Sequence, residues 1–335
     1  MASKDIVVIG GSTGSGAALK QLVRGLSADL AAGVFVTTHI PSQGQSFLPD
    51  LLSEAGPLPA ARAVDGQPIE PGRIYVAPED RHLLLIDGTV RLGLGPRENM
   101  VRPAIDPMFR SAAMSHGSRV IGVVLTGMLS DGAAGLHAIK QQGGVAVVQH
   151  PLDAVADEMP RAALQAVEAD YVTRVDELAE LIGDLVGSPA DPGPPPPDEL
   201  VFEVEVAAGA RLGSAMLAQF AKPATLTCPD CHGVLSEVLG SKPLRYRCQI
   251  GHAYTAEILA SRNEQLDEAI RIAMRVMEER VELVERMARD ARETGRAAVA
   301  ELYDQRAEEY RRYALTLREA ATLSTRLHRA AEQPA

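Results

Sequence analysis

The N-terminal part of the chain reads Ile6-Val7-Val8-Ile9-Gly10-Gly11-Ser12-Thr13-Gly14-Ser15-Gly16, and a helix-like segment, residues 17–26, follows directly. An unbroken run of β-branched residues is typical of a strand that is covered on both faces. A glycine-rich turn between such a strand and a helix is typical of the carboxyl edge of a parallel sheet. The stretch therefore predicts the first strand, turn and helix of an α/β domain.

The same alternation continues through residues 1–190. Short apolar runs occur at 6–9, 34–37, 74–77, 83–86, 120–125 and 145–148, and helix-like stretches lie at 17–26, 108–116 and 133–141. Strands that alternate with helices predict a doubly wound, mostly parallel sheet. The dipeptide Asp87-Gly88 predicts a hairpin turn within this domain.

Composition narrows the classes of protein that the chain can represent. Its 335 residues carry a net charge of -11, with 33 Lys+Arg against 44 Asp+Glu, so binding to a nucleic-acid backbone is not expected. The apolar runs are far shorter than the roughly 20 residues that a membrane span needs, and no secretory signal pattern is present. We therefore expect a cytoplasmic protein without membrane insertion.

A proline-rich stretch divides the chain. Residues 191–198 read Asp-Pro-Gly-Pro-Pro-Pro-Pro-Asp, which predicts a stiff, extended spacer. We place the α/β domain at 1–190, a linker at 191–222, a small cysteine-containing module at 223–257 and a helical region at 258–330. In that last region apolar residues recur every three or four positions on both sides of Thr294-Gly295, which predicts two long helices packed as an antiparallel hairpin.

The glycine turn allows two kinds of chemistry. One is phosphate binding, but Gly16 is followed by Ala17 where a P-loop needs lysine, and the turn lacks the third glycine of the dinucleotide fingerprint. The other is a nucleophile held on a tight turn beside free N–H groups, and Ser12 occupies that position. A serine in such a turn can equally be a helix cap, so Ser12 needs partners.

Two candidate partners follow other predicted strands. His39 ends the run 34–38, and Asp131 lies between the apolar run 120–125 and the helix-like stretch 133–141. Carboxyl ends of parallel strands meet at one edge of the sheet, where open α/β sheets build their sites. Each residue also has a structural interpretation, as a capped histidine and as a helix N-cap.

The motifs together resemble those of the CheB family of chemotaxis receptor methylesterases. The family signature consists of a G-x-S-T-G turn, a strand that ends in His-x-Pro, and a T-G-M-x-x-D-G-A-x-G segment. This chain has them at residues 10–14, 39–41 and 126–135, and further family-like pieces at 74–78, 102–112 and 159–163. The resemblance covers residues 5 to about 185 in the expected order. The family commonly has glycine where Ser15 and Leu129 stand in this chain.

The resemblance implies a Ser12–His39–Asp131 triad, with Thr13 and the main chain of Met128 forming the oxyanion site. It also implies a hydrolase that needs no cofactor and that demethylates glutamyl methyl esters on chemoreceptor-type proteins in chemotaxis-like signalling. Family members also deamidate glutamines. The first strand begins within ten residues of Met1, so we expect no receiver domain ahead of it and no activation through one.

The three cysteines form a separate pattern. Cys228 and Cys231 make a C-x2-C pair, and Cys248 and His252 make a C-x3-H pair sixteen residues later. Three thiolates and one imidazole at this spacing predict a closed, structural Zn²⁺ site in a small ribbon. Two alternatives remain open, namely a redox C-x2-C pair and a site in which His232 replaces His252.

The sequence leaves the role of the tail open. The zinc ribbon and the helical hairpin can serve regulation, self-association or binding of a partner. Two other functions also remain open: an esterase for another methyl-esterified protein, and a signalling adaptor that binds its partner through the tail.

Overall fold

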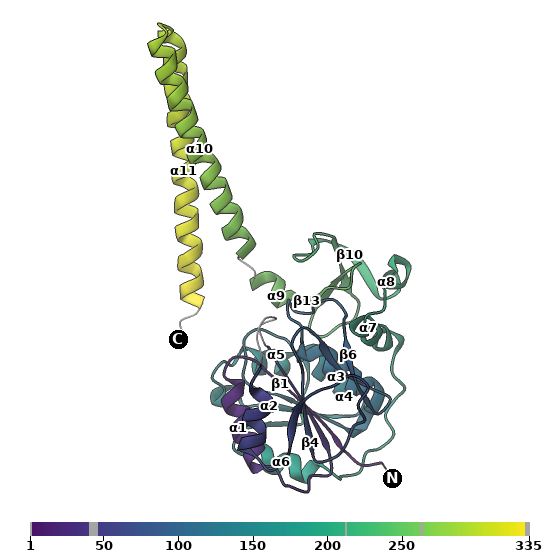
Figure 1. Cartoon of the computed structure of the whole chain (residues 1–335). Helices are drawn as coiled ribbons and strands as arrows, with labels where there is room; N and C mark the ends of the chain where they lie inside the picture. The colour runs from purple at the N-terminus through teal and green to yellow at the C-terminus, as the bar shows by residue number, and fades with distance from the viewer. Residues whose placement is uncertain (1, 40–45, 212, 262–263, 332–335) are drawn as a thin grey trace. The chain divides into compact units, whose positions relative to one another are not determined.

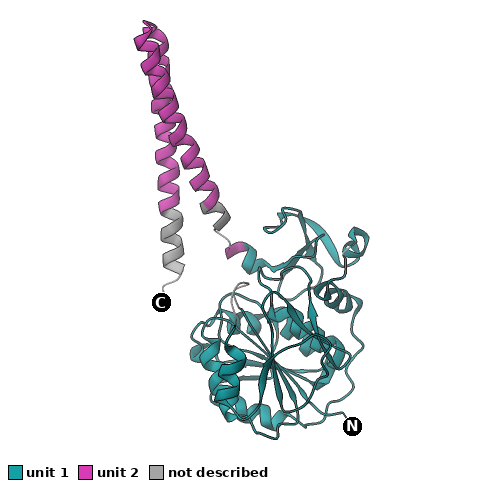
Figure 2. Cartoon of the chain, viewed as in Figure 1, with its two compact units in different colours: residues 1–259 teal, residues 260–335 magenta. Residues whose placement is uncertain are grey.

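The structure is a computed structural model that describes residues 2–39, 46–211, 213–261 and 264–331 (Figure 1). The chain divides into two compact units, residues 1–259 and residues 260–335 (Figure 2). The predicted zinc module and the proline-rich stretch thus lie in the same compact unit as the sheet. None of the described helices is long and apolar enough to cross a membrane.

The first unit is built on a seven-stranded sheet of the order β3-β4-β2-β1-β7-β8-β9, in which every neighbouring pair is parallel. Its strands are β1 (Ile6–Gly11), β2 (Gly33–Thr38), β3 (Ala60–Arg62), β4 (Arg73–Val76), β7 (Val120–Val124), β8 (Val145–Gln149) and β9 (Tyr171–Thr173). The doubly wound parallel sheet that the sequence predicts is thereby confirmed. The short strands β3 and β9 carry no long apolar run and were not predicted.

The apolar run 83–86 forms a strand, but this strand does not belong to the seven-stranded sheet. The run belongs to β5 (His82–Ile86), which pairs antiparallel with β6 (Thr89–Gly93) in a separate two-stranded sheet. The turn between these strands is Asp87-Gly88, where both residues have positive φ. The hairpin prediction is confirmed, and β5 is not a strand of the main sheet.

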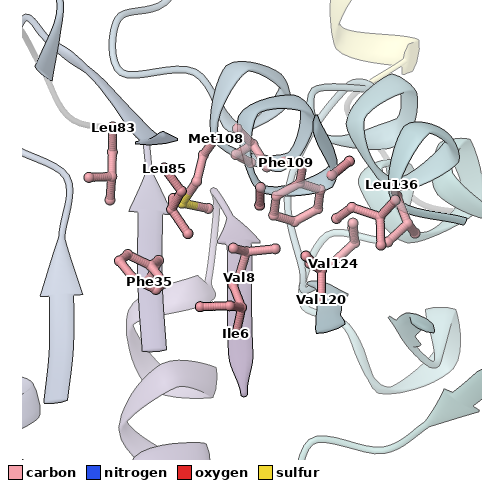
Figure 3. Packing of buried hydrophobic residues seen from close by; sticks show 14 of the residues in the cluster. Ile6, Val8, Phe35, Leu83, Leu85, Met108, Phe109, Val120, Val124 and Leu136 are labelled. Carbon is pink, nitrogen blue, oxygen red and sulfur yellow. The ribbon is translucent and has the colours of Figure 1, made fainter. Parts of the chain in front are cut away.

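Helices cover both faces of the parallel sheet. Helices α1 (Ser15–Gly25), α2 (Leu48–Ala55) and α6 (Leu178–Leu185) pack on one face, and α3 (Ile105–His116), α4 (Ala133–Gln141) and α5 (Glu158–Ala166) on the other. Side chains of a strand point alternately to its two faces, so β1 serves both cores. Val7 and Ile9 join the cluster of α1, whereas Ile6 and Val8 join that of α3, with Met108 and Phe109 (Figure 3).

Close packing of α3 on β1 depends on Gly10. A Cβ atom at this position would lie 2.3 Å from the Ile105 side chain, at the first residue of α3. The helix can therefore begin directly beside the end of β1. This position matters for the site because the free N–H groups of the α3 N-terminus lie at the same edge.

The interval 191–222, which the sequence indicates as a linker, is only partly extended. Residues 191–197 have no helix or strand and are exposed, but α7 (Asp198–Ala208) and α8 (Ser214–Phe220) follow. The acidic residues Asp198 and Glu199 in the first turn of α7 favour helix formation at this point. Two short 3-10 helices, Gly117–Arg119 and Pro151–Asp153, complete the connections of the α/β part.

The predicted ribbon is a four-stranded antiparallel sheet of the order β10-β11-β12-β13. Its strands are β10 (Ala221–Thr227), β11 (Val234–Val238), β12 (Arg245–Cys248) and β13 (Ala253–Thr255), and the short helix α9 (Ala256–Ser261) follows. We refer to residues 221–259 as the Cys/His module. Strand β12 ends at Cys248, the first residue of the C-x3-H pair.

The second unit consists of α10 (Glu264–Glu293) and α11 (Ala297–Ala331), which pack along each other. Three ion pairs link the two helices: Asp304 to Arg292, Arg311 to Glu285 and Arg318 to Glu278. As the residue number rises along α11, the number of its partner in α10 falls. The hairpin is therefore antiparallel, and Gly295 with φ 73° lies in its turn. The helical region expected from residue 258 begins within α9, which ends at Ser261, and the first long helix, α10, begins at Glu264; residues 262–263 lie outside the described part.

A buried charge network joins the α/β part, α7 and the Cys/His module. Glu98 pairs with Arg110 of α3 and with Arg247 of β12, and Glu203 of α7 pairs with Arg110, Arg245 and Arg247. All five side chains are at most 7% exposed. Removing one carboxylate would leave guanidinium groups buried without a counter-charge, which is far more costly than losing a surface pair.

We expect Glu203→Gln to lower the free energy of unfolding by about 3–5 kcal/mol, because three buried arginines lose a shared counter-ion. Glu70→Gln is the matched control, since its pair with Arg73 is exposed and worth about 1 kcal/mol or less. Urea denaturation of both variants measures the difference. A loss below about 1 kcal/mol for Glu203→Gln would show that the network does not tie the three parts together.

Candidate active site

Ser12, His39 and Asp131 lie at the carboxyl edge of three adjacent strands. Ser12 directly follows β1, His39 directly follows β2, and Asp131 lies in the loop after β7, with β1 between the other two strands. The register pairs Gly11 with Thr38, so Ser12 and His39 are the next residues of neighbouring strands about 4.8 Å apart. Residues 40 and 41 of the His-x-Pro motif lie outside the described residues.

The turn that carries Ser12 is fixed by backbone contacts. The Ser12 N–H donates to the carbonyl of Thr126 at 2.9 Å, and the Ser15 hydroxyl donates to the Ser12 carbonyl at 2.6 Å. Gly14 has φ 79°, a conformation that favours glycine, and precedes α1 as its N-cap. Ser12 is half-buried and packs so close to Gly127 that a Cβ there would lie 2.9 Å from the Ser12 Cβ.

His39 and Asp131 contact each other directly. The distance between His39 Nε2 and Asp131 Oδ2 is 2.8 Å, and the exposed fractions of the two side chains are 21% and 1%. The imidazole is thus open to a substrate while the carboxylate is shielded from water. A buried carboxylate bonded to one ring nitrogen fixes the tautomer and leaves the other nitrogen, Nδ1, to exchange a proton.

Four N–H donors hold the Asp131 carboxylate. Besides His39, these are the backbone N–H groups of Ile105 at 2.7 Å and Asp106 at 3.2 Å, and the side-chain amide of Asn99 at 2.9 Å. Ile105 and Asp106 are the first residues of α3, so Asp131 also faces the positive end of a helix dipole. Burial alone would raise the pKa of Asp131, but the bonds from His39, Ile105 and Asn99 lower it below its usual value.

Asp106 lies beside this carboxylate and behaves in the opposite way. Its oxygens accept bonds from the Gly135 N–H at 2.7 Å and from Asn99 Nδ2 at 3.1 Å. Burial, together with the charge of Asp131, raises the pKa of Asp106 to about 6. Asn99 Nδ2 is therefore shared between two buried carboxylates, a role that the sequence analysis did not identify. The family-like piece 102–112, which includes Ile105 and Asp106, was the nearest signal.

Thr13 directly follows Ser12, and Met128 follows Gly127, which packs against Ser12. The Thr13 carbonyl accepts a bond from Thr126 Oγ1 at 2.9 Å, and Met128 is 48% exposed in the loop after β7. Within the described residues, no hydrogen bond uses the backbone N–H of either residue. Both groups are available to a developing oxyanion at this edge.

Leu129 has φ 61°, a left-handed conformation that glycine adopts more easily. Its N–H donates to Glu158 Oε2 at 2.7 Å. The glycine that the family commonly has at this position fits the same backbone. Here a leucine side chain compensates by packing, together with Met100, on the core of the Cys/His module.

The ligand atoms of Cys228, Cys231, Cys248 and His252 lie within 4.8 Å of one another. Cys231 Sγ lies 3.6 Å from Cys248 Sγ. His252 Nδ1 lies 3.7 Å from Cys228 Sγ and 3.4 Å from Cys248 Sγ. Zinc–thiolate bonds of 2.3 Å give tetrahedral edges of about 3.8 Å. The donor set therefore fits a single tetrahedral metal ion.

The arrangement of these four residues also concerns the two alternatives to the predicted zinc site, a redox C-x2-C pair and a site with His232 in place of His252. The cysteines are free thiols and no disulfide links Cys228 to Cys231. Among the described residues, His252 and not His232 lies with the thiols. Tyr254 supports the cluster from β13, because its hydroxyl contacts Cys228 Sγ at 3.4 Å and donates to Asp230 at 2.6 Å. Burial raises the pKa of the Cys248 thiol to about 12.

Known proteins similar to this chain share the α/β part. A protein-glutamate methylesterase/protein-glutamine glutaminase of Anaeromyxobacter dehalogenans is 38% identical over 181 residues, which cover 54% of this chain and 53% of that protein. One of the same name from Methanosarcina acetivorans is 35% identical over 194 residues, 56% of this chain and 54% of the relative. The chain thus spans about half the length of these two relatives.

A solved structure agrees with these similarities. The catalytic domain of CheB methylesterase from Thermotoga maritima superposes with a TM-score of 0.53 at 33% identity and covers 55% of this chain and 100% of that domain. The profile of the family described as CheB methylesterase matches residues 7–182, which include Ser12, His39 and Asp131. This chain therefore belongs to the CheB methylesterase family.

Proposed function

We propose that this protein is a serine hydrolase that removes methyl esters from glutamyl side chains of chemoreceptor-type proteins in chemotaxis-like signalling, and that it also deamidates glutamines. The proposal is supported by the names of the relatives, which are protein-glutamate methylesterases/protein-glutamine glutaminases. The observation that carries it is the His39–Asp131 pair, which lies at the same sheet edge as Ser12.

The reaction follows from these three side chains. Ser12 Oγ attacks the ester carbonyl carbon while His39 takes its proton, and Asp131 stabilises the imidazolium that forms. The N–H groups of Thr13 and Met128 bind the oxyanion. The tetrahedral intermediate collapses to an acyl-serine, and methanol leaves with the proton from His39. A water deprotonated by His39 then frees the glutamate, and with a glutamine substrate the leaving group is ammonia.

The test measures methanol released from a methylated chemoreceptor fragment by the full chain. Hydrolysis of the receptor ester, but not of an unrelated protein methyl ester, is the expected result. Hydrolysis of the unrelated ester alone would move the function to another signalling pathway. Failure of a fluorophosphonate to label Ser12 would instead favour an adaptor with an inactive hydrolase domain.

We also propose that Cys228, Cys231, Cys248 and His252 hold a structural Zn²⁺ ion. The fit of the four ligand atoms to one tetrahedron supports this, and four protein ligands leave no position for a substrate. The module is too small to be stable through its core alone, so metal binding would supply folding energy. Unpaired thiols suit a reducing compartment, in keeping with a cytoplasmic protein.

Metal analysis of the purified full chain should find about one zinc per chain. Cys228→Ser should lose it, because the variant removes one of four ligands. His232→Asn is the matched control: this histidine lies in the same turn, and asparagine tolerates its φ of 59°. Loss of zinc in His232→Asn, with zinc retained after a His252 substitution, would show that the ligand set is wrong.

A further inference from the structure

Strand β13 of the Cys/His module lies against the loop that precedes α3. The Asn99 N–H donates to the Ala253 carbonyl at 2.8 Å, and Asn99 Oδ1 accepts from the Thr255 N–H at 3.2 Å. Glu98 of the same loop pairs with Arg247 of β12. The module is therefore bonded through both backbone and side chains to a loop of the α/β part.

Two residues of this interface, Asn99 and Thr255, also contact Asp131 or the residue before it. Asn99 uses its other amide end, Nδ2, to donate to Asp131 Oδ1 at 2.9 Å. Thr255 Oγ1 lies 2.7 Å from the hydroxyl of Ser130, the residue before Asp131. Asn99 is 7% exposed, and Ser130 and Thr255 are each 1% exposed, so water does not compete for these bonds.

The Thr255 N–H, together with the carboxylates of Asp131 and Asp106, fixes which way the Asn99 amide points. With Oδ1 held by Thr255, Nδ2 faces the two carboxylates of Asp131 and Asp106. A flipped amide would place its oxygen against both carboxylates and its NH2 group against another donor. Among the described hydrogen bonds, the Thr255 N–H is the one that holds Asn99 Oδ1, so without β13 this end of the amide is no longer fixed.

Packing adds a second, independent tie. Leu129, two residues before Asp131, and Met100, next to Asn99, pack on the cluster formed by Cys228, Cys248 and Tyr254. Leu129 and Met100 both have positive φ, with values of 61° and 70°. A residue with such a strained backbone stays in this conformation only when its surroundings hold it, and the packing of Met100 and Leu129 on the module does so. Both loops that position the Asp131 carboxylate thus rest on the Cys/His module.

We propose that the Cys/His module positions the catalytic carboxylate, with Asn99 and Thr255 as positioning residues, so that metal loading of the module sets the turnover of the hydrolase. The proposal rests on the proposed hydrolase function. His252 directly precedes β13 and Cys248 ends β12, so loss of the metal releases the segment that carries Thr255. The Cys/His module then has a defined task in the reaction, which is to position Asp131.

The first test replaces Asn99 by glycine, which keeps the φ of 50° accessible and keeps the backbone N–H that bonds Ala253, but removes the side chain with its amide. We expect kcat to fall about 10²-fold with KM nearly unchanged, because a misplaced catalytic group of this kind costs that much. Thr255→Val should lower kcat in the same direction. Thr225→Val, on the exposed part of β10, is the matched control and should leave kcat unchanged.

The second test removes the metal from the full-length protein with a chelator. We expect kcat to fall to the level of Cys228→Ser, and to return when Zn²⁺ is added. Chelator should have no further effect on Cys228→Ser itself. Thermal unfolding followed by circular dichroism is measured alongside, because the parallel sheet should stay folded while activity is lost.

The rate at which a fluorophosphonate labels Ser12 is a readout that does not depend on the ester substrate. If the wild type labels Ser12 but hydrolyses no glutamyl ester, the proposed substrate is wrong and the labelling rates still test the positioning. If Asn99→Gly and the metal-stripped protein label as fast as the wild type, within twofold, the module does not position Asp131 and the proposal is overturned.

Discussion

A Ser12→Ala variant is expected to lose ester hydrolysis by about 10⁶-fold in kcat, because the methyl group cannot attack a carbonyl and the acyl-serine cannot form. The fold should be unaffected: Ser12 is half-buried, and its described hydrogen bonds run through its backbone N–H and carbonyl. Methanol release from a methylated receptor fragment measures the loss. The melting temperature should stay within about 2 °C of that of the wild type.

Ser27→Ala is the matched control, since Ser27 is an exposed serine beyond the end of α1 and should turn over as the wild type does. Fluorophosphonate labelling should disappear from Ser12→Ala and persist in the control. Residual hydrolysis by Ser12→Ala at the wild-type rate would remove Ser12 from the mechanism and, with it, the proposed acyl-serine.

The placement of Ser12, His39 and Asp131 at one sheet edge was predictable because it depends on local patterns. Each residue follows an apolar run that forms a strand of the sheet, and parallel strands bring their carboxyl ends to one edge. The order of the strands was not predictable from those runs. The register that makes Ser12 and His39 neighbours is set by pairing between residues 6–11 and 33–38, which no local pattern specifies.

The support of Asp131 was not predictable for a similar reason. Asn99 lies in a loop and contacts Asp131, 32 residues away, and Thr255, 156 residues away. Arg247 is fully buried, and Glu98 and Glu203 neutralise its charge. A prediction from hydrophobic periodicity puts charged residues on the protein surface. Only the long-range ion pairs in the structure show that Arg247, Glu98 and Glu203 are buried.

Helices α7 and α8 illustrate a third limit. The proline-rich stretch predicts an extended spacer, and residues 191–197 have no helix or strand, but the predicted linker also included the residues after them. Asp198 and Glu199 at the start of α7 are a helix signal that the proline run obscured. The helix is then stabilised by burial of Phe202, Val204 and Val206, and by the ion pairs of Glu203.

An Asp131→Asn variant is expected to keep the fold and to lower kcat by about 10⁴-fold, as in other triads in which the carboxylate is replaced by an amide. The carboxylate accepts N–H bonds on both oxygens, from His39 and Ile105 on one and from Asn99 and Asp106 on the other. An asparagine NH2 group must face one of these pairs of donors. Whichever pair the NH2 group faces, the imidazolium of His39 loses the negative charge that stabilises it.

Stability should change with pH in a defined direction. The pKa of Asp131 is lower in the folded protein than its unfolded value near 3.8, so the ionised carboxylate stabilises the fold above that value and the contribution is lost as pH falls. The variant should therefore be less stable than the wild type at pH 7, with a gap that narrows below about pH 4. Asp50→Asn, an exposed position on α2, is the control and should show no such gap. Urea unfolding at pH 7 and at about pH 3, with kcat measured at pH 7, tests both parts. An Asp131→Asn enzyme with wild-type kcat would mean that His39 works without this carboxylate.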